Sequence, residues 1–419
     1  MPERDSSTNP ISSRREEALI LIGSPTDQSL LTSAATRVVI ASYGAVTAAG
    51  PDAAAFLAAL RLNTSGLRPD ERFNSPRFQS SIVGAAPRNP DFASEDDPAH
   101  SLATDALTQA RRAAGTASAL KLAPGRIGLV LATTKANIEA LERLADGRPT
   151  SEAARRHLQP ELLAADLAVE HGAGGPVQTV STACTSGSIA LQQGAKLIQR
   201  GAADAVFVVG ADHLSAFVVA GFTSLKAIDP SGCRPFDRER CGLSPGEAGA
   251  AILLVRGDLA VGPTVELCGW GSSNDANHMT GPSRDGSGLA QAIRGALNSA
   301  NITAADIDYV NVHGTGTPYN DAMEAAALRT IFADACPPVS GQKGMLGHTL
   351  GAAGVVETIA CVLALREQFL PGTPRLSNVA DGMPASLVKE PRPAERLRHV
   401  LKLSTGFGGV NCALVLRHG

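Results

Sequence analysis

A strand-like segment, a cysteine-containing turn and a helical segment follow one another at residues 177–199, and this junction constrains the fold more than any other stretch. Residues 177–181 are rich in valine and threonine and favour a strand, whereas residues 186–199 are rich in alanine, leucine and glutamine and favour a helix. A strand that passes directly into a helix is typical of α/β proteins. We therefore predict that helices pack on sheets in this chain.

Other segments support the same prediction. Buried strands are expected at residues 127–132, 205–210, 250–255 and 401–404, and helical spacing occurs at residues 103–114 and 291–300. Aromatic residues make up only 4% of the chain, while alanine and glycine are abundant, which suits helices packed closely on sheets.

Cys184 lies in the turn between the predicted strand and helix, at the mouth of the helix. Peptide N–H groups and the positive end of the helix dipole converge there, so we expect a lowered thiol pKa and a nucleophile. A small cysteine among alanine and serine is also common core filling. The residues downstream favour the nucleophile.

Two histidines occur in glycine-rich settings, His313 in Asn-Val-His-Gly-Thr-Gly-Thr-Pro and His348 in Leu-Gly-His-Thr-Leu-Gly-Ala-Ala-Gly. Residues 308–312 predict a strand that ends at His313, with a helix after Pro318, and sites gather at the carboxyl ends of strands in open α/β sheets. Small residues around His348 let the backbone approach a ligand before an apolar helix at 355–365. A single histidine of this kind is more often structural, but two with one cysteine predict a shared site.

Four motifs follow one another in the order Ala-Cys-Thr-Ser-Gly, His-Gly-Thr-Gly-Thr-Pro, Lys-Gly-Met-Leu-Gly-His-Thr-Leu-Gly-Ala-Ala-Gly and Gly-Phe-Gly-Gly. In this order they resemble the β-ketoacyl-acyl carrier protein synthases, the elongating condensing enzymes of the thiolase superfamily. The resemblance covers residues 37–419, about nine-tenths of the chain. Each motif alone is a weak signal, whereas the ordered set is highly specific.

The resemblance implies a role for each matching residue. Cys184 would accept the acyl chain as a thioester, and His313 and His348 would serve the decarboxylation of a malonyl thioester. Further residues match the family's remaining functions: Lys343 and Glu357 as polar support for the second histidine, Phe407 and Gly408 at the gate and oxyanion site, and Thr280, Thr315 and Thr317 in the substrate-binding region. In the same region Asp321 matches an acid that supports the direct substrate contacts from behind. No metal and no resident cofactor are expected, because the phosphopantetheine arm of an acyl carrier protein carries the substrate.

The chemistry explains why such residues are needed. A cysteine thiolate can hold an acyl group as a thioester and so divide one difficult step into two easier ones. Loss of CO₂ from a malonyl thioester builds negative charge on the thioester oxygen, and two imidazoles that donate hydrogen bonds stabilise the resulting enolate. Backbone N–H groups at Cys184 and Phe407 are expected to form the other oxyanion site, for the tetrahedral step.

The resemblance also implies a thiolase-like α/β fold, in which two similar halves form a five-layered αβαβα sandwich. A chain of 419 residues with 44% apolar content can bury two sizeable cores. We expect a flexible N-terminal extension at residues 1–36, a half with the cysteine at 37–260 and a half with the two histidines at 261–419. No internal repeat is visible in the sequence.

The formal net charge of −3 argues against nucleic-acid binding, which normally shows a strong basic excess. Carrier proteins are acidic, so a local basic patch would suffice for docking. Candidates that align with carrier-docking regions of the family are Arg61, Arg68, Arg72 and Lys226, although ordinary solvated charges are the alternative for each. The family also implies a dimer, either of identical chains or with a related ketosynthase or chain-length subunit.

Seven cysteines show no Cys-x-x-Cys pair and no zinc-ligand spacing, which indicates a reduced, cytoplasmic protein. The apolar runs are too short for a transmembrane helix. Arg14 and Arg15 resemble the start of a twin-arginine export signal, but Glu16 and Glu17 follow at once. We therefore read the first 36 residues as an extension or as the product of an upstream start codon.

Three departures from the family pattern favour a specialised pathway, such as type II polyketide or polyene synthesis, over primary fatty acid synthesis. They are Gly-Gly-Val-Asn at 408–411, Cys-Gly-Leu-Ser at 241–244 and Thr-Thr-Lys-Ala-Asn at 133–137.

Three rival functions remain to be compared. A degradative thiolase lacks support because Ala413 follows Cys412, so that a Cys-x-Gly setting is missing; an initiating ketosynthase would carry asparagine in place of His348. A non-catalytic chain-length subunit stays as the alternative, although such subunits characteristically lack the cysteine.

Overall fold

The computed structural model describes residues 37–115, 121–262 and 264–419, and the predicted extension at residues 1–36 lies outside the described residues. Ten strands form one large sheet. The strands of the first half are β1 (Val38–Thr47), β4 (Ile127–Ala132), β5 (Val177–Val180), β6 (Ala205–Asp212) and β7 (Ala248–Arg256). The strands of the second half are β8 (Val265–Asn274), β9 (Tyr309–Asn311), β10 (Val339–Ser340), β13 (His399–Thr405) and β14 (Val410–His418).

The two halves repeat the same strand topology. Their orders are β1-β7-β6-β4-β5 and β8-β14-β13-β9-β10, and in each half the first two pairings are antiparallel and the last two are parallel. The half-sheets meet where β1 and β8 pair antiparallel, Val39 opposite Glu266 and Ile40 opposite Val265. An internal duplication that the sequence does not show is therefore plain in the topology.

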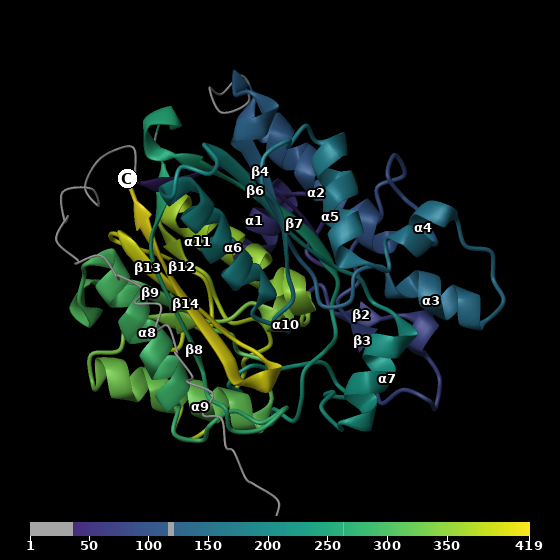
Figure 1. Cartoon of the computed structure of the whole chain (residues 1–419). Coiled ribbons are helices and arrows are strands. Elements are labelled where there is room, and N and C mark those ends of the chain that lie inside the picture. Colours follow the sequence, from purple (N-terminus) through teal and green to yellow (C-terminus); the bar gives the residue numbers. More distant parts are fainter. Residues whose placement is uncertain (1–36, 116–120, 263) are drawn as a thin grey trace, which may run out of the picture.

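The helices complete five layers (Figure 1). Their bounds are α1 (Ala53–Leu62), α2 (Pro98–Ala114), α3 (Ile138–Ala145), α4 (Glu152–Arg156), α5 (Pro160–Glu170), α6 (Ser186–Gln199), α7 (Ala216–Ser224), α8 (Ser287–Ala300), α9 (Pro318–Phe332), α10 (Lys343–Leu346) and α11 (Ala353–Glu367). Helices α6 and α11 contact each other and strands of both half-sheets, whereas α2 and α5 cover the outer face of the first half and α8 and α9 that of the second. The predicted αβαβα sandwich is confirmed. Two small sheets lie outside it, β2 (Arg68–Pro69) with β3 (Ile82–Val83) and β11 (Phe369–Leu370) with β12 (Arg392–Pro393).

The predicted elements occur in the structure, with longer ends in several cases. The strand at 127–132 and the helix at 186–199 have the predicted bounds. Helix α2 begins at Pro98, five residues earlier than its apolar spacing predicts, because the Asp97 side chain caps it by accepting the His100 N–H and proline occupies its first turn. Among the described residues, no helix is both long and apolar enough to cross a bilayer.

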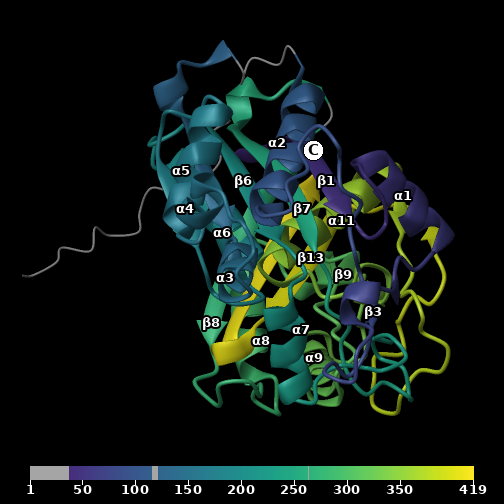
Figure 2. The same ribbon diagram turned by 90° about the vertical axis from the view of Figure 1, so that its right-hand side faces the viewer.

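Helices α3 and α7 lie side by side on one edge of the first half (Figure 2). The Glu142 carboxylate of α3 accepts the N–H groups of Ala216 and Phe217 at the start of α7, at 3.3 and 2.6 Å. A carboxylate at a helix N-terminus satisfies free N–H groups and complements the helix dipole. This contact joins the segment after β4 to the segment after β6.

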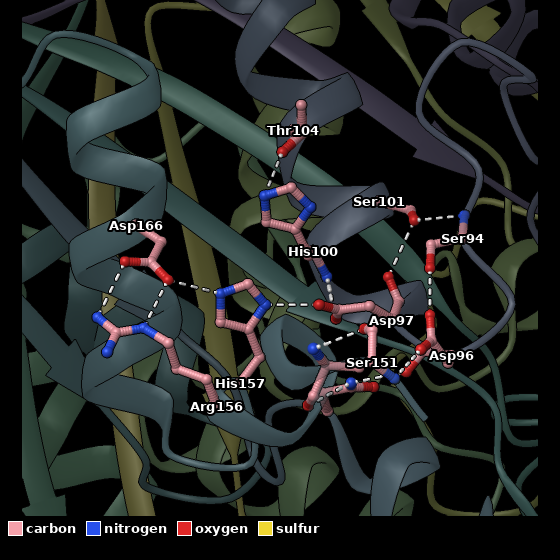
Figure 3. A network of polar contacts seen from close by, with 12 residues as sticks. Ser94, Asp96, Asp97, His100, Ser101, Thr104, Ser151, Arg156, His157 and Asp166 are labelled. Carbon is pink, nitrogen blue, oxygen red and sulfur yellow. Dashed lines mark hydrogen bonds and ion pairs between the residues drawn. The ribbon is translucent and has the colours of Figure 1, made fainter. Parts of the chain in front are cut away.

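The buried imidazole of His157 connects the segment after β4 to helices α2 and α5 by hydrogen bonds (Figure 3). His157, at the end of α4, bonds Asp97 through Nδ1 and Asp166 through Nε2, the latter at 3.0 Å, and its ring stacks on His100 with centroids 5.2 Å apart. The His157 carbonyl accepts the Asn137 N–H. The loop at 133–137 is thereby held in place above the carboxyl end of β4.

This network makes stability depend on pH. Burial alone would lower the pKa of His157, but the hydrogen bonds and charges of Asp97 and Asp166 outweigh it and raise that pKa. Because the folded-state pKa is the higher one, the stabilisation is complete below the unfolded pKa of about 6.5 and is lost as pH rises through the folded value.

His157→Gln should therefore lower the free energy of unfolding by about 1–3 kcal/mol at about pH 6 and by clearly less at about pH 9. Chemical denaturation of both proteins at the two pH values measures the difference. His418→Gln, at the end of the chain, is the control and should change neither value by more than a few tenths of a kcal/mol. An equal loss for His157→Gln at both pH values would contradict a charged imidazole.

Candidate active site

Cys184 is held in a strained turn between β5 and α6. Ala183 has a left-handed backbone with φ of 51°, Thr182 and Cys184 form an isolated bridge, and α6 begins two residues later at Ser186. The side chains of Thr185 and Ser186 donate back to the carbonyls of Thr182 and Ala183, both at 2.6 Å. A non-glycine residue with positive φ persists only where its surroundings enforce it, which is common at functional sites. The turn fixes the thiol just before the helix begins.

The turn that follows His348 repeats this design in the second half. Leu350 has φ of 53° and lies three residues before the start of α11, as Ala183 lies three residues before the start of α6. The two helix starts touch, because a Cβ added to Gly187 would lie 2.7 Å from the Val355 nitrogen. Only glycine allows that approach. The duplicated fold thus brings the cysteine turn and the histidine turn together.

Cys184, His313 and His348 meet at one point. Their sulfur and ring nitrogen atoms lie within 4.8 Å of one another, and the imidazoles meet edge to face with centroids 5.1 Å apart. All three side chains are buried. His313 follows β9, His348 follows α10 and Cys184 follows β5, so three separate segments supply the group.

Hydrogen bonds assign the same tautomer to both imidazoles. The Lys343 ammonium donates to Nδ1 of His313 at 3.1 Å, and the Leu350 N–H donates to Nδ1 of His348 at 3.2 Å. Burial, together with nearby positive charges, lowers the pKa of both histidines well below the usual value, so both rings are neutral. Each Nε2 then carries the proton. Nε2 has no free lone pair in this tautomer, so the pair suits donation to an oxyanion better than metal binding.

The sequence predicts that Lys343 and Glu357 support His348, and this prediction is wrong because they support His313. Both were expected to support His348, but Lys343 bonds Nδ1 and the carbonyl oxygen of His313, the latter at 2.7 Å, and pairs with Glu357. His348 instead takes its hydrogen bond from the backbone of Leu350. Lys343 lies at the start of α10, and its buried ammonium lies between the end of β9 and helix α11, so it reaches His313 rather than His348.

The prediction of a lowered thiol pKa is also wrong. Burial raises the pKa of Cys184 to about 11, although Lys343 and the N–H groups of Phe407 and Cys184 act in the opposite direction. The thiol precedes the first helical residue by two positions and is desolvated, so the helix dipole does not dominate. The resting side chain is therefore a thiol.

Backbone N–H groups lie beside the sulfur, where the family resemblance implies an oxyanion site. The N–H groups of Phe407 and Cys184 lower the pKa of the Cys184 thiol, so they lie close enough to the sulfur to donate to a thioester oxygen held there. The Gly408 N–H donates to the Met279 carbonyl at 2.7 Å, so Gly408 does not belong to the oxyanion site as predicted. The Phe407 ring lines the cavity against Phe222, with centroids 6.2 Å apart.

An open cavity of about 520 Å³ leads to the three reactive side chains. Thr280, Thr315 and Thr317 line it as predicted, and the hydroxyls of the last two lie 2.9 Å apart. Asp321 does not line the cavity itself, which agrees with its predicted place as an acid that supports the substrate-binding residues from behind. It is fully buried and accepts the N–H groups of Phe236 and Gly316, at 2.8 and 3.2 Å, and so holds the threonine loop from behind.

Of the basic residues proposed for carrier docking, only Lys226 lines this cavity. Arg61 pairs with Glu367, Arg68 donates to the Ala85 carbonyl at 3.0 Å, and Arg72 pairs with Asp70 at 2.7 Å. All four residues are exposed. Carrier docking through Lys226, Arg61, Arg68 or Arg72 stays a prediction.

Two buried charged residues of the site escaped the sequence analysis. Glu324 accepts the N–H groups of His313 and Gly314 at 2.6 and 2.7 Å, and burial raises its pKa to about 7. Lys402, in β13, pairs with Glu357 at 3.0 Å. A lysine within the apolar run Val-Leu-Lys-Leu was the signal that could have revealed it, because charged residues are almost never fully buried without a partner.

The buried thiol leads to a test. If the pKa of Cys184 is about 11, the rate of its alkylation by iodoacetamide should keep rising with pH up to about pH 10, because the thiolate fraction keeps growing. Mass spectrometry of the Cys184 peptide measures this rate, and the buried Cys361 is the internal control, which should stay unmodified. A plateau below about pH 8 would instead support the thiolate that the sequence suggested.

Comparison with known proteins is consistent with this geometry. The family model described as "Beta-ketoacyl synthase, N-terminal domain" matches residues 35–260, and "Beta-ketoacyl synthase, C-terminal domain" matches residues 264–377. A putative polyketide β-ketoacyl synthase 1 of Streptomyces halstedii is 35% identical over 412 residues, with 91% of this chain and 97% of the relative covered. A 3-oxoacyl-[acyl-carrier-protein] synthase 2 of Vibrio cholerae is 31% identical, with 91% and 99% covered.

Solved structures of similar proteins have the same fold as this chain. The ishigamide ketosynthase/chain length factor matches with a TM-score of 0.84 and 30% identity, and a ketosynthase from Xenorhabdus doucetiae in complex with its chain length factor matches with 0.82 and 31%. Each match covers 91% of this chain and 98% of the other. The resemblance seen in the sequence motifs is confirmed, and the chain belongs to the β-ketoacyl synthase family of condensing enzymes, with a thiolase-like fold.

Proposed function

We propose that the protein is an elongating β-ketoacyl-acyl carrier protein synthase of a specialised pathway, which condenses an acyl thioester on Cys184 with a malonyl thioester. The observation that carries the proposal is the meeting of one thiol and two neutral imidazoles, all within 4.8 Å at the end of an open cavity. The three departures from the family pattern support a polyketide or polyene pathway, as do polyketide synthases among the relatives.

In the first step the Cys184 sulfur attacks the carbonyl carbon of an acyl thioester. The Phe407 and Cys184 N–H groups donate to the oxygen that becomes negative. The carbon–sulfur bond to the carrier breaks, and the leaving thiolate accepts the proton that Cys184 loses. This transfer is required because the pKa of the buried thiol is about 11.

In the second step a malonyl thioester places its carbonyl oxygen between the Nε2–H groups of His313 and His348. The bond to the carboxylate carbon breaks, CO₂ leaves, and the electron pair forms an enolate whose oxygen accepts both hydrogen bonds. Donors of this kind contribute about 3–4 kcal/mol each. The enolate carbon then attacks the carbonyl carbon of the acyl group on Cys184, the bond from that carbon to the Cys184 sulfur breaks, and the released thiolate takes a proton from solvent water.

The cavity suits the phosphopantetheine arm of an acyl carrier protein, and no resident cofactor is required for these steps. Thr280, Thr315 and Thr317 offer hydroxyls along its wall, and the exposed Lys226 on the same wall supports docking of an acidic carrier there. A second ketosynthase-like chain is the other proposed partner, either identical or a chain-length subunit, since the two solved relatives are described with chain length factors. Seven cysteines without a disulfide support action in the cytoplasm.

The rival function is that of a non-catalytic chain-length subunit. Such a subunit has no use for a reactive triad, and the complete set of Cys184, His313 and His348 opposes it. The two functions differ in whether an acyl group is ever attached to the protein.

Incubation with an acyl-carrier thioester should add one acyl mass to Cys184, measured on the intact protein and its peptides. Cys241 is the matched control because it is the other thiol of the same cavity. Cys241→Ser should keep the adduct, and Cys184→Gln should lose it. An adduct that survives Cys184→Gln, or no adduct at all, would contradict the proposal.

The same Cys184→Gln variant tests the decarboxylation. Its neutral amide resembles an acylated cysteine, so CO₂ release from malonyl carrier should equal or exceed that of the parent. Adding His313→Ala or His348→Ala should slow the release by roughly two orders of magnitude, because one enolate donor is lost. Undiminished release in both double variants would show that the imidazoles are not the donors.

A further inference from the structure

Lys402 is a fully buried lysine in the middle of strand β13, and neither step of the proposed reaction uses it. Its ammonium lies 3.0 Å from Oε2 of Glu357, 3.2 Å from the Ser188 hydroxyl and within hydrogen-bond distance of the Ser404 hydroxyl. These partners come from helix α11, helix α6 and β13 itself. A buried ammonium is costly unless its charge is compensated, so its position needs a reason.

Glu357 has two lysine partners. Its Oε1 accepts from Lys343, and its Oε2 faces Lys402. Two ammonium groups therefore share one carboxylate, and the cluster carries one positive charge in excess. Lys343 transmits the position of this cluster directly to His313 through its bond to Nδ1.

Among the other ionisable groups around the cluster, Glu324 cancels this excess charge only when it is ionised, and its pKa of about 7 leaves the cluster positive below about that pH. Those that influence the two histidines, the lysines or their neighbours are Glu324 and Asp321 on α9, Cys361 on α11, Cys412 on β14, Lys196 on α6, Tyr309 on β9, Asp212 on β6 and Cys184 itself. Asp212 is paired with Lys135 at 3.3 Å. Burial raises the pKa of Glu324 to about 7 and that of Asp321 to about 6, and it raises the pKa of each thiol and of Tyr309. Asp321 is compensated by Arg240 at 3.6 Å.

We propose that Lys402 is a positioning residue for decarboxylation: as the second counter-ion of Glu357, it leaves the buried cluster behind His313 with a net positive charge that favours the enolate. The inference rests on the proposed function of the same site. Lys402 neither gives nor takes a proton in the reaction. The bond to the carboxylate carbon breaks and CO₂ leaves as before, and Lys402 acts only on the negative charge that moves to the enolate oxygen.

The positive charge of Lys402 should stabilise the enolate and lower the pKa of the two imidazoles. If Lys343 were its only partner, Glu357 would form a neutral ion pair, and the pair would exert little net electrostatic attraction on the enolate. The extra charge attracts the enolate and disfavours a second proton on either imidazole, and Lys343 and Lys402 both add to burial in lowering the pKa of His313 and His348. One unit charge in a protein interior typically changes a neighbouring equilibrium by about tenfold.

The test uses CO₂ release from malonyl carrier by the full chain in the Cys184→Gln background, measured across a pH series. Lys402→Met removes the charge at similar length, and Lys402→Gln removes it while keeping an amide that can bond Ser188 and Ser404. Either variant should be about tenfold slower, with the acidic limb of the profile displaced upward by about one pH unit. Lys402→Arg keeps the charge and should retain the position of that limb.

The matched control is Lys389→Met, which removes the same charge from an exposed lysine whose ammonium donates to the Ser377 carbonyl at 2.8 Å. It should leave rate and profile unchanged. The neutral variants of Lys402 could unfold at a lower temperature and yet keep the parent's rate of CO₂ release and its pH profile. That result would show that the lysine serves packing alone, and it would overturn the proposal.

A second readout does not depend on activity. Titration of the His313 and His348 ring signals by NMR should show both pKa values raised by about one unit in Lys402→Gln. Absence of release by Cys184→Gln itself would refute the proposed function, whereas an unchanged titration would refute the role of Lys402, so the two failures are distinguishable.

Discussion

The bond from the Lys343 ammonium to Nδ1 of His313 is the contact on which the rest of the site depends. An ammonium can only donate, so Nδ1 must accept, and the proton of the neutral ring must lie on Nε2. The same ammonium bonds the His313 carbonyl and Glu357, which fixes the end of β9 against α11. One buried charge therefore determines tautomer, ring orientation and local packing together.

The duplicated fold supplies the setting for this contact. Each half ends a parallel strand or short helix in a tight turn, and each turn contains a residue with positive φ three positions before a central helix. Because α6 and α11 meet at Gly187 and Gly354, the cysteine of one half lies beside the histidines of the other. The proposed reaction would need both halves, since neither contains the thiol and the two imidazoles together.

Local signals in the sequence predict an α/β chain and mark the cysteine and the two histidines, whereas the five-layered fold was predicted from the resemblance of the ordered motifs to a known family. A strand, a turn and a helix can be read at 177–199, and the glycine-rich motifs mark His313 and His348. What it misses depends on contacts between distant segments: the target of Lys343, the raised pKa of Cys184 and the pairing of Lys402 with Glu357. Desolvation by the finished core, which reversed the expected thiol pKa, has no local signature.

Neutron diffraction from a deuterium-exchanged crystal at neutral pH tests the central claim most directly, because it locates the protons on both rings. The account predicts deuterium on Nε2 of His313 and of His348, none on either Nδ1, and a fully deuterated Lys343 ammonium directed at His313. Deuterium on Nδ1 of either histidine would contradict it, because that ring would be an imidazolium or would have no Nε2–H donor for the enolate.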